Sequence, residues 1–154
     1  MKCLPVILLT GLLIVTGKAY AAGSDDPPKA ADLAEFVAAQ KQVEAENYKE
    51  ATTLLQRVIA AQPQNVNALN LLAYSQRKSD DLKESLLNYK KALAMDPSHK
   101  DAHEYIGELY LRLGDLASAE EHLERLNQLC LFGCEQLDEL KAAVAAYKKK
   151  VKPN

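Results

Sequence analysis

The sequence predicts an all-α fold, an α-α superhelix of about three helix pairs followed by a C-terminal capping helix. Three observations lead to this prediction. Apolar, small and turn-forming residues recur with a period of 34 residues over most of the chain. Helix-forming composition is interrupted only by short polar or proline-bearing stretches. The last part of the chain carries one apolar stripe at helical spacing.

The bulk composition is typical of one compact helical domain. The chain has 154 residues, of which 48% are hydrophobic and 26% are charged, with only 6 Gly and 6 Pro. The formal net charge is −2. Nucleic-acid binding needs a concentrated basic face, so we expect no nucleic-acid partner.

Residues 1–21 predict a secretory signal peptide. They combine a basic start, an apolar run over residues 4–15 and small residues before a cut expected between Ala21 and Ala22. The run is too short to span a bilayer as a stable helix, although a retained anchor stays open as an alternative. We therefore expect a periplasmic or secreted protein without stable membrane insertion after cleavage. Residues 22–31 are polar and proline-bearing and predict an N-terminal tether.

Three equal segments, residues 32–65, 66–99 and 100–133, superpose when the sequence is shifted by 34 residues. Each segment predicts two helices joined by a turn. The turn residues are Asn47, Asp81 and Asp115. Apolar positions of the first helices recur at Ala38, Leu72 and Ile106. Small residues, where the two helices of a pair approach each other, recur at Ala51, Ser85 and Ala119.

This pattern resembles the tetratricopeptide repeat, and the chain as a whole looks like a small exported bacterial member of that family. The resemblance covers residues 32–133. It departs from the family pattern in three respects. Glu35, Leu69 and His103 replace the usual tryptophan, and the later tyrosine survives only as Tyr110, being Gln42 and Gln76 elsewhere. Leu131 replaces the closing proline of the third repeat. The resemblance implies a helical solenoid that binds proteins as an adaptor or scaffold.

Residues 134–154 predict the capping helix and a basic tail. The apolar stripe consists of Leu137, Leu140, Val144, Tyr147 and Val151. Acidic residues near the start of this helix and lysines near its end complement the helix dipole. We expect the helix to cover the apolar face of the last repeat.

By the same resemblance, the first helix of each repeat lines a concave groove. The groove residues it implies are Phe36, Gln40, Asn67, Asn70, Tyr74, Arg77, Glu104 and Glu108. Amide and aromatic side chains suit an extended peptide, and the two glutamates favour a basic partner residue. The lysine, asparagine and arginine set with which chaperone-tail-binding members hold a terminal carboxylate has no match in the corresponding columns.

Cys130 and Cys134 are the two cysteines that remain after signal cleavage. An oxidising compartment favours a disulfide between them, and their spacing on a helix brings their Cα atoms into the range that a disulfide needs. Metal ligation and free or redox-active thiols remain open alternatives.

His99 and His103 lie four residues apart near the start of the third repeat. Two imidazoles on one helix face can contribute to a transition-metal site, but a stable site needs further ligands. His103 also occupies the tryptophan column, where partly buried packing is expected. Metal binding by these histidines is the alternative interpretation.

No catalytic constellation, Cys-x-x-Cys motif or glycine-rich phosphate loop is present in the sequence. We therefore expect no enzyme and no cofactor. The function predicted is an exported adaptor or assembly factor whose groove binds a peptide or a helix of another protein. The alternative is a metal-handling protein that uses His99, His103 and the cysteine pair, and self-assembly into a homo-oligomer is a further possibility.

Overall fold

The computed structural model describes the backbone of residues 30–151 and the side chains of residues 33–151. The predicted signal peptide and nearly all of the predicted tether lie outside the described residues. Helix α1 begins at Ala30, so the last two residues assigned to the tether are helical. The described elements are α1 (Ala30–Glu44), α2 (Tyr48–Ala61), α3 (Val66–Lys78), α4 (Leu82–Met95), α5 (Lys100–Leu113), α6 (Leu116–Leu129) and α7 (Glu135–Val151).

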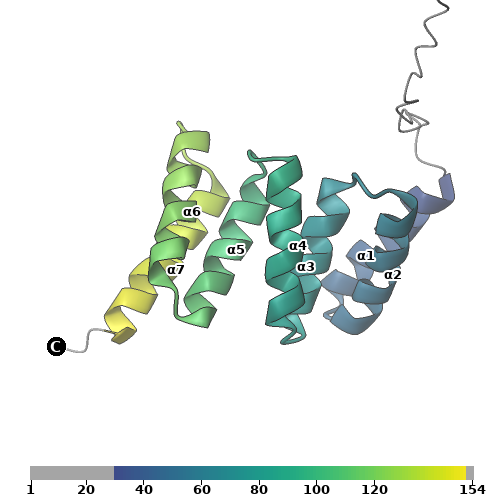
Figure 1. Ribbon diagram of the computed structural model, residues 1–154, viewed down its shortest axis with the longest axis horizontal. Coiled ribbons are helices and arrows are strands. Elements are labelled where there is room, and N and C mark those ends of the chain that lie inside the picture. The colour runs from purple at the N-terminus through teal and green to yellow at the C-terminus, as the bar shows by residue number, and fades with distance from the viewer. Residues whose placement is uncertain (1–29, 152–154) are drawn as a thin grey trace, which may run out of the picture.

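The helices form a row of three pairs that ends in α7, as Figure 1 shows. Within each pair the two helices pack closely, α1 on α2, α3 on α4 and α5 on α6. We call α1, α3 and α5 the leading helices and α2, α4 and α6 the trailing helices. The leading helices also contact one another along the row, and α7 packs on both α5 and α6. The predicted all-α superhelix is confirmed for the described residues.

The small residues predicted at the helix contacts are fully buried. Ala51, Ser85 and Ala119 have no exposed surface, so the leading and trailing helices of each pair approach closely at these points. Ser85 also satisfies its hydroxyl there, because its Oγ donates a hydrogen bond of 2.7 Å to the carbonyl oxygen of Ala73 on the leading helix. A buried hydroxyl needs such a partner.

Each turn within a pair contains one residue with a left-handed backbone. Glu46, Asp80 and Gly114 have φ angles of 57°, 71° and 83°, and they are spaced by 34 residues like the rest of the repeat. This conformation ends the leading helix and lets the chain reverse into the trailing helix. Only the third turn uses glycine, the residue that adopts a positive φ without steric cost.

The capping helix covers the last pair much as predicted. Leu140 and Val144 are buried, and Leu137 and Tyr147 are partly buried against the α6 and α5 side chains, whereas Val151 at the end of the predicted stripe is 56% exposed. Lys148 of α7 forms an ion pair with Glu120 of α6. None of the helices in residues 30–151 has the length and apolar character needed to cross a membrane.

Candidate functional site

A row of three tyrosines crosses the leading helices. The ring of Tyr74 on α3 lies between Tyr48, at the start of α2, and Tyr105 on α5. Its centroid is 6.2 Å from that of Tyr48, with a nearly perpendicular ring, and 5.0 Å from that of Tyr105. All three side chains are only partly buried. We call Tyr48, Tyr74 and Tyr105 the tyrosine row; it presents aromatic surface from all three helix pairs.

Two cations lie over the rings of the tyrosine row. The guanidinium carbon of Arg77 is 5.4 Å from the Tyr74 centroid and 5.6 Å from the Tyr105 centroid. The ammonium of Lys78 is 5.8 Å from the Tyr48 centroid and 5.7 Å from the Tyr74 centroid. All four distances fit cation–π contacts. The cations therefore restrict the ring positions and bring positive charge to the row.

An open hollow of about 660 Å³ adjoins the end of this row. It lies between the turn that joins α1 to α2 and the end of α3. The residues that line it are Gln42, Glu46, Asn47, Tyr48, Lys49, Glu50, Lys78 and Ser79. Tyr48 and Lys78 thus belong both to the hollow and to the surroundings of the tyrosine row, and together they extend the candidate site across the first two repeats.

The structure supports a surface role for only some of the predicted groove residues. Gln40 and Asn67 are exposed, and Phe36 and Tyr74 are partly buried. The Oδ1 of Asn67 lies 3.1 Å from Nε2 of His99 at the start of the next leading helix. A ligand that binds along α1 and α3 can therefore reach these four side chains.

Three other predicted groove residues differ from the expectation. Glu104 is only 3% exposed and Asn70 is 6% exposed, so neither presents a free polar group to a ligand. Glu108 forms an ion pair of 2.7 Å with Arg77, whose side chain is only 12% exposed. Burial of Glu104 and the ion pair of Glu108 therefore leave neither carboxylate free for the basic partner residue expected from the sequence.

Helix α7 explains the burial of Glu104. It packs along α5 and brings the Glu139 carboxyl next to that of Glu104. Burial, together with the hydrogen bond and the negative charge of Glu139, raises the pKa of Glu104 to about 9. Glu104 therefore keeps its proton at neutral pH. The alignment of three repeats places Glu104 in the groove. In the folded chain the capping helix α7 covers this position instead.

The two candidate metal-binding histidines do not act together. His99 is the N-cap of α5, and its Nδ1 accepts a 3.2 Å hydrogen bond from the backbone N–H of Ala102. Nδ1 of His103 instead lies 2.8 Å from Nδ1 of His122 on α6, and its Nε2 lies 3.1 Å from the Pro97 carbonyl oxygen. Both ring nitrogens of His103 are thus engaged within the protein.

No cluster of three or more His, Cys, Asp or Glu side chains suited to a metal ion occurs among residues 33–151. Burial lowers the pKa of His103, and burial together with the positive charges of His103 and Lys90 lowers that of His122 to about 4. The Pro97 carbonyl oxygen accepts from Nε2–H of the neutral His103 ring, so Nδ1 of His103 accepts a hydrogen bond from Nδ1–H of His122. The pair is explained by packing between α5 and α6.

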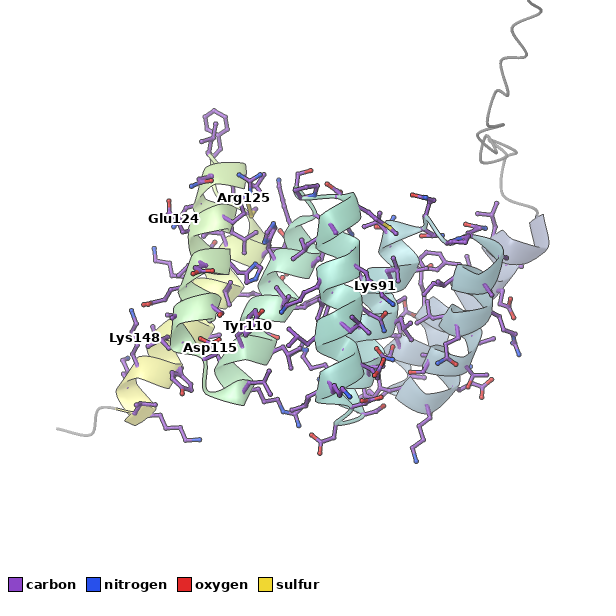
Figure 2. All side chains as sticks on the ribbon, in the orientation of Figure 1. Lys91, Tyr110, Asp115, Glu124, Arg125 and Lys148 are labelled. Carbon is purple, nitrogen blue, oxygen red and sulfur yellow. A yellow bond between two sulfur atoms is a disulfide. The ribbon has the colours of Figure 1, made fainter. Side chains whose placement is uncertain are left out.

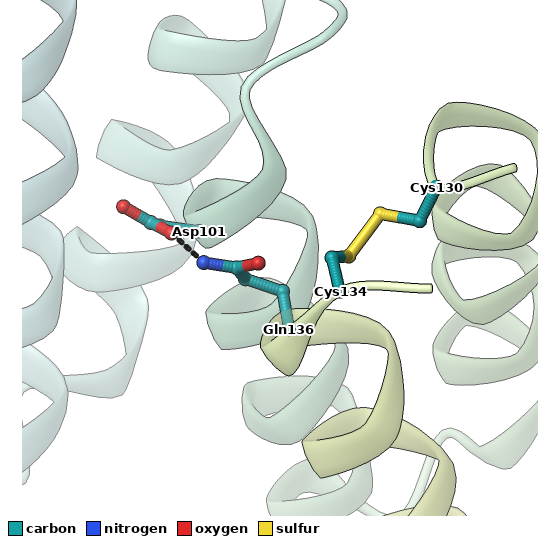
Figure 3. Close-up of a disulfide and its surroundings, with 4 residues drawn as sticks. All are labelled: Asp101, Cys130, Cys134 and Gln136. Atoms are coloured by element: carbon teal, nitrogen blue, oxygen red, sulfur yellow. Dashed lines mark hydrogen bonds between the residues drawn. A yellow bond between two sulfur atoms is a disulfide. The ribbon is translucent and has the colours of Figure 1, made fainter. Parts of the chain in front are cut away.

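Cys130 and Cys134 are joined by a disulfide that closes the loop between α6 and α7, with Cα atoms 5.7 Å apart. Figure 3 shows this bond beside the hydrogen bond of 2.7 Å that Gln136 donates to Asp101 of α5. Cys130 is buried in the same apolar cluster as Leu140. The loop and the start of α7 are therefore fastened to α5 and α6 together.

Sequence reasoning missed Tyr48 and Tyr105 as members of the site. A signal was present at Tyr48, because the equivalent positions after the other two turns are Leu82 and Leu116. An aromatic hydroxyl in a column that otherwise holds leucine indicates a partly exposed position. No pattern in the sequence predicts the hollow, because its shape depends on how two turns lie relative to each other.

Comparison with known proteins finds matches that contain the tetratricopeptide repeat. The model of the tetratricopeptide repeat family matches residues 36–87 and 72–129, which together span more than half of the chain. A TPR repeat-containing thioredoxin, TTL4, of Arabidopsis thaliana is 40% identical over 81 residues. That match covers 50% of this chain but 11% of the plant protein, so the chain spans only a small part of its relative.

Three solved structures show the same fold at low sequence identity. The first TPR of Spaghetti (RPAP3), bound to the HSP90 peptide SRMEEVD, has a TM-score of 0.67 at 20% identity and covers 76% of this chain and 93% of that chain. The type III secretion chaperone SycD of Yersinia enterocolitica, in complex with a peptide of the translocator YopD, has a TM-score of 0.69 at 17% identity, covering 82% and 100%. The Sgt2 TPR domain of Aspergillus fumigatus has a TM-score of 0.72 at 18% identity, covering 80% and 81%.

The family match agrees with the 34-residue period, the buried small positions and the seven described helices. The matching sequence relative is a plant protein, so the match does not support the bacterial origin expected above. The chain belongs to the tetratricopeptide repeat family.

Proposed function

We propose that this protein is an adaptor or assembly factor that binds a peptide or a helix of another protein along its leading helices. The single observation that carries the proposal is the tyrosine row, which presents partly exposed aromatic surface on three successive repeats next to an open hollow. Aromatic residues supply large contact area at low entropic cost and dominate many protein interfaces. Binding rather than catalysis is proposed, in keeping with the family.

The matched structures are consistent with this proposal. Two of them contain a bound peptide, the HSP90 peptide in the Spaghetti domain and the YopD peptide in SycD. Their likeness to this chain is one of fold, so the peptides themselves say nothing of its partner. The likeness is consistent with a protein of this fold that binds a peptide.

The proposed location is the periplasm or the extracellular space, after cleavage between Ala21 and Ala22. The basis is the sequence alone: a basic start, an apolar run and small residues before the cut. An N-terminal sequence of the natively processed protein that begins at Ala22 would support this location. A natively isolated chain that still starts at Met1 would contradict it.

The partner chemistry that we propose differs from the one expected from the sequence. Since Glu104 is buried and Glu108 is paired with Arg77, these residues provide no free acidic surface for a basic partner residue. The tyrosine row instead favours an apolar or aromatic side chain, and the exposed amides of Gln40 and Asn67 can hydrogen-bond a peptide backbone.

The proposal is tested with peptides selected from a random display library on the mature protein. Their dissociation constants are compared for wild type, Tyr74→Ala and the control Gln56→Ala, which alters an exposed residue of α2. Loss of the central ring should weaken binding at least tenfold, whereas the control should bind as wild type does. Selected peptides that bind Tyr74→Ala as tightly as wild type would reject this site.

A further inference from the structure

The loop between α6 and α7 exposes two adjacent large apolar side chains. Leu131 is 80% exposed and Phe132 is 102% exposed, more than any other large apolar side chain described. One exposed leucine is ordinary on a protein surface. A leucine and a phenylalanine side by side, both largely exposed, form an apolar protrusion that gains from burial in a complex.

The backbone holds these two side chains in a fixed turn. Leu131 and Phe132 are the central residues of a turn closed by a 2.9 Å hydrogen bond from the Gly133 N–H to the Cys130 carbonyl oxygen. Gly133 has a φ of 84°, which a residue with a side chain rarely adopts. The disulfide between Cys130 and Cys134 closes the same five residues.

The turn is also anchored to the core. Cys130 is only 6% exposed and belongs to the apolar cluster of α5, α6 and α7. A rigid support lowers the entropy that Leu131 and Phe132 lose when a partner orders them. The turn is therefore preorganised to present an anchor, whereas an open loop of the same composition would have to be ordered first.

The charges near the turn narrow the choice of partner. Between Leu126 and Leu140 the charged residues are Glu135, Asp138 and Glu139, all acidic. Glu124 and Arg125 lie near the end of α6 (Figure 2), and an Arg125 Nη donates to Gln128 within that helix. Excess negative charge disfavours an anionic lipid surface and favours a partner with basic residues.

We propose that the Leu131–Phe132 turn is a second docking site, which inserts both side chains into an apolar hollow rimmed by Lys or Arg on another protein. The site lies at the α7 end of the helix row, whereas the tyrosine row joins α2, α3 and α5 (Figure 1). It therefore acts independently of the peptide-binding surface proposed above.

The first step of the test is photocrosslinking in the native host. The crosslinker p-benzoylphenylalanine replaces Phe132 in one version of the full chain and Leu87 in a matched control. Leu87 is suitable because it is a 46% exposed leucine on α4, far from the turn in the sequence. The protein captured at position 132, and not at position 87, is identified and produced in pure form.

The second step measures the affinity of that pure protein. The chain contains no tryptophan, so Phe132→Trp supplies a unique fluorescent probe, and its emission should shift to the blue on binding. Phe132→Ser should raise the Kd at least tenfold, and Leu87→Ser should leave it unchanged. Added salt should weaken wild-type binding because the rim charges are opposite. Tyr74→Ala should bind as wild type does, which separates this site from the tyrosine row.

Four results would overturn the proposal. The first is equal crosslinking at positions 87 and 132, and the second is crosslinking only to a second copy of this chain. The third is an unchanged affinity of Phe132→Ser for the captured protein. The fourth is a blue shift of the Phe132→Trp emission with phosphatidylcholine or phosphatidylglycerol vesicles alone. The second and fourth results would assign the turn to self-association and to a lipid surface, respectively. Circular dichroism of each variant excludes loss of folding as the cause.

Discussion

Gly107 of α5 lies so close to Leu140 of α7 that a Cβ at position 107 would be 2.6 Å from the Leu140 Cδ2 and 2.7 Å from its Cδ1. Leu140 has no exposed surface. The missing side chain at position 107 is therefore what allows the capping helix to pack directly on the third leading helix. The equivalent positions of the other two repeats are Ala39 and Ala73. At position 107 even alanine would require Leu140 to shift.

Gly107→Ala should destabilise the protein, although alanine is the better helix former. Overpacking costs about 1–3 kcal/mol, against about 1 kcal/mol gained in helix propensity. We expect a net loss in the free energy of unfolding, measured by chemical denaturation. Leu140→Ala should cost less in the Gly107→Ala background than in wild type, because it removes the clash. A more stable Gly107→Ala protein would show that α7 is not held in this contact.

Glu46→Gly should stabilise the first turn. Glu46 has a φ of 57°, a conformation that costs a residue with a Cβ about 1–2 kcal/mol and costs glycine little. The greater flexibility of glycine in the unfolded chain offsets part of this gain, so we expect about 0.5–1 kcal/mol in the free energy of unfolding. Gly114→Ala at the equivalent turn, with a φ of 83°, is the reverse control and should destabilise by a similar amount.

Glu104→Gln should remove a pH dependence of stability. The pKa of Glu104 is raised to about 9 by burial and by Glu139, so the folded chain keeps a proton that the unfolded chain releases near its ordinary pKa of 4.5. The stabilisation from this group is complete below pH 4.5 and is lost as the pH rises toward 9. The glutamine amide does not ionise, so it stays neutral at pH 9, where Glu104 of the wild type loses its proton. The melting temperature of the variant should therefore exceed that of wild type most clearly at pH 9.

The exposed Glu121→Gln on α6 is the control for that measurement, and it should leave the pH profile of the melting temperature unchanged. A Glu104→Gln variant whose profile runs parallel to that of wild type from pH 5 to pH 9 would contradict the raised pKa of Glu104.

The His103–His122 pair should make the protein sensitive to acid. The pKa of each ring is lowered, that of His122 to about 4, so between pH 6.5 and about 4 the unfolded chain binds protons that the folded chain does not. The contribution of the pair is present above pH 6.5 and declines as the pH falls toward 4. Thermal unfolding from pH 7.5 to pH 4.5 should show a shallower decline for His122→Gln than for wild type. Equal declines in melting temperature for the two proteins would show that the histidine pair does not cause the acid sensitivity.

The sequence carried enough information for the helices and their pairing because both follow from local spacing. A 34-residue period with Ala51, Ser85 and Ala119 in one column defines where helices meet, and these residues are fully buried. The binding surface was harder to predict. Asn70 and Glu104 occupy groove columns in the alignment, yet their burial depends on how neighbouring helices pack.

Two further features depend on contacts between distant residues. His103 meets His122, 19 residues away, and not His99, because α5 and α6 pack antiparallel and His99 is taken up as the cap of α5. Tyr48 joins Tyr74 from the start of a trailing helix, whereas the groove predicted from the sequence uses leading helices alone. Such cross-helix relationships have no fixed spacing in the sequence and appear only when the helices are assembled.

The most direct test of the central claim is to map a bound ligand on the folded protein. A library-selected peptide is added to the ¹⁵N-labelled mature chain, and amide chemical-shift changes and hydrogen-exchange protection are recorded residue by residue. Binding at the tyrosine row predicts the largest effects on α3 around Tyr74, on α5 around Tyr105 and at the start of α2 around Tyr48. Effects confined to α4 and α6, with Tyr74 and Tyr105 unperturbed, would contradict the account.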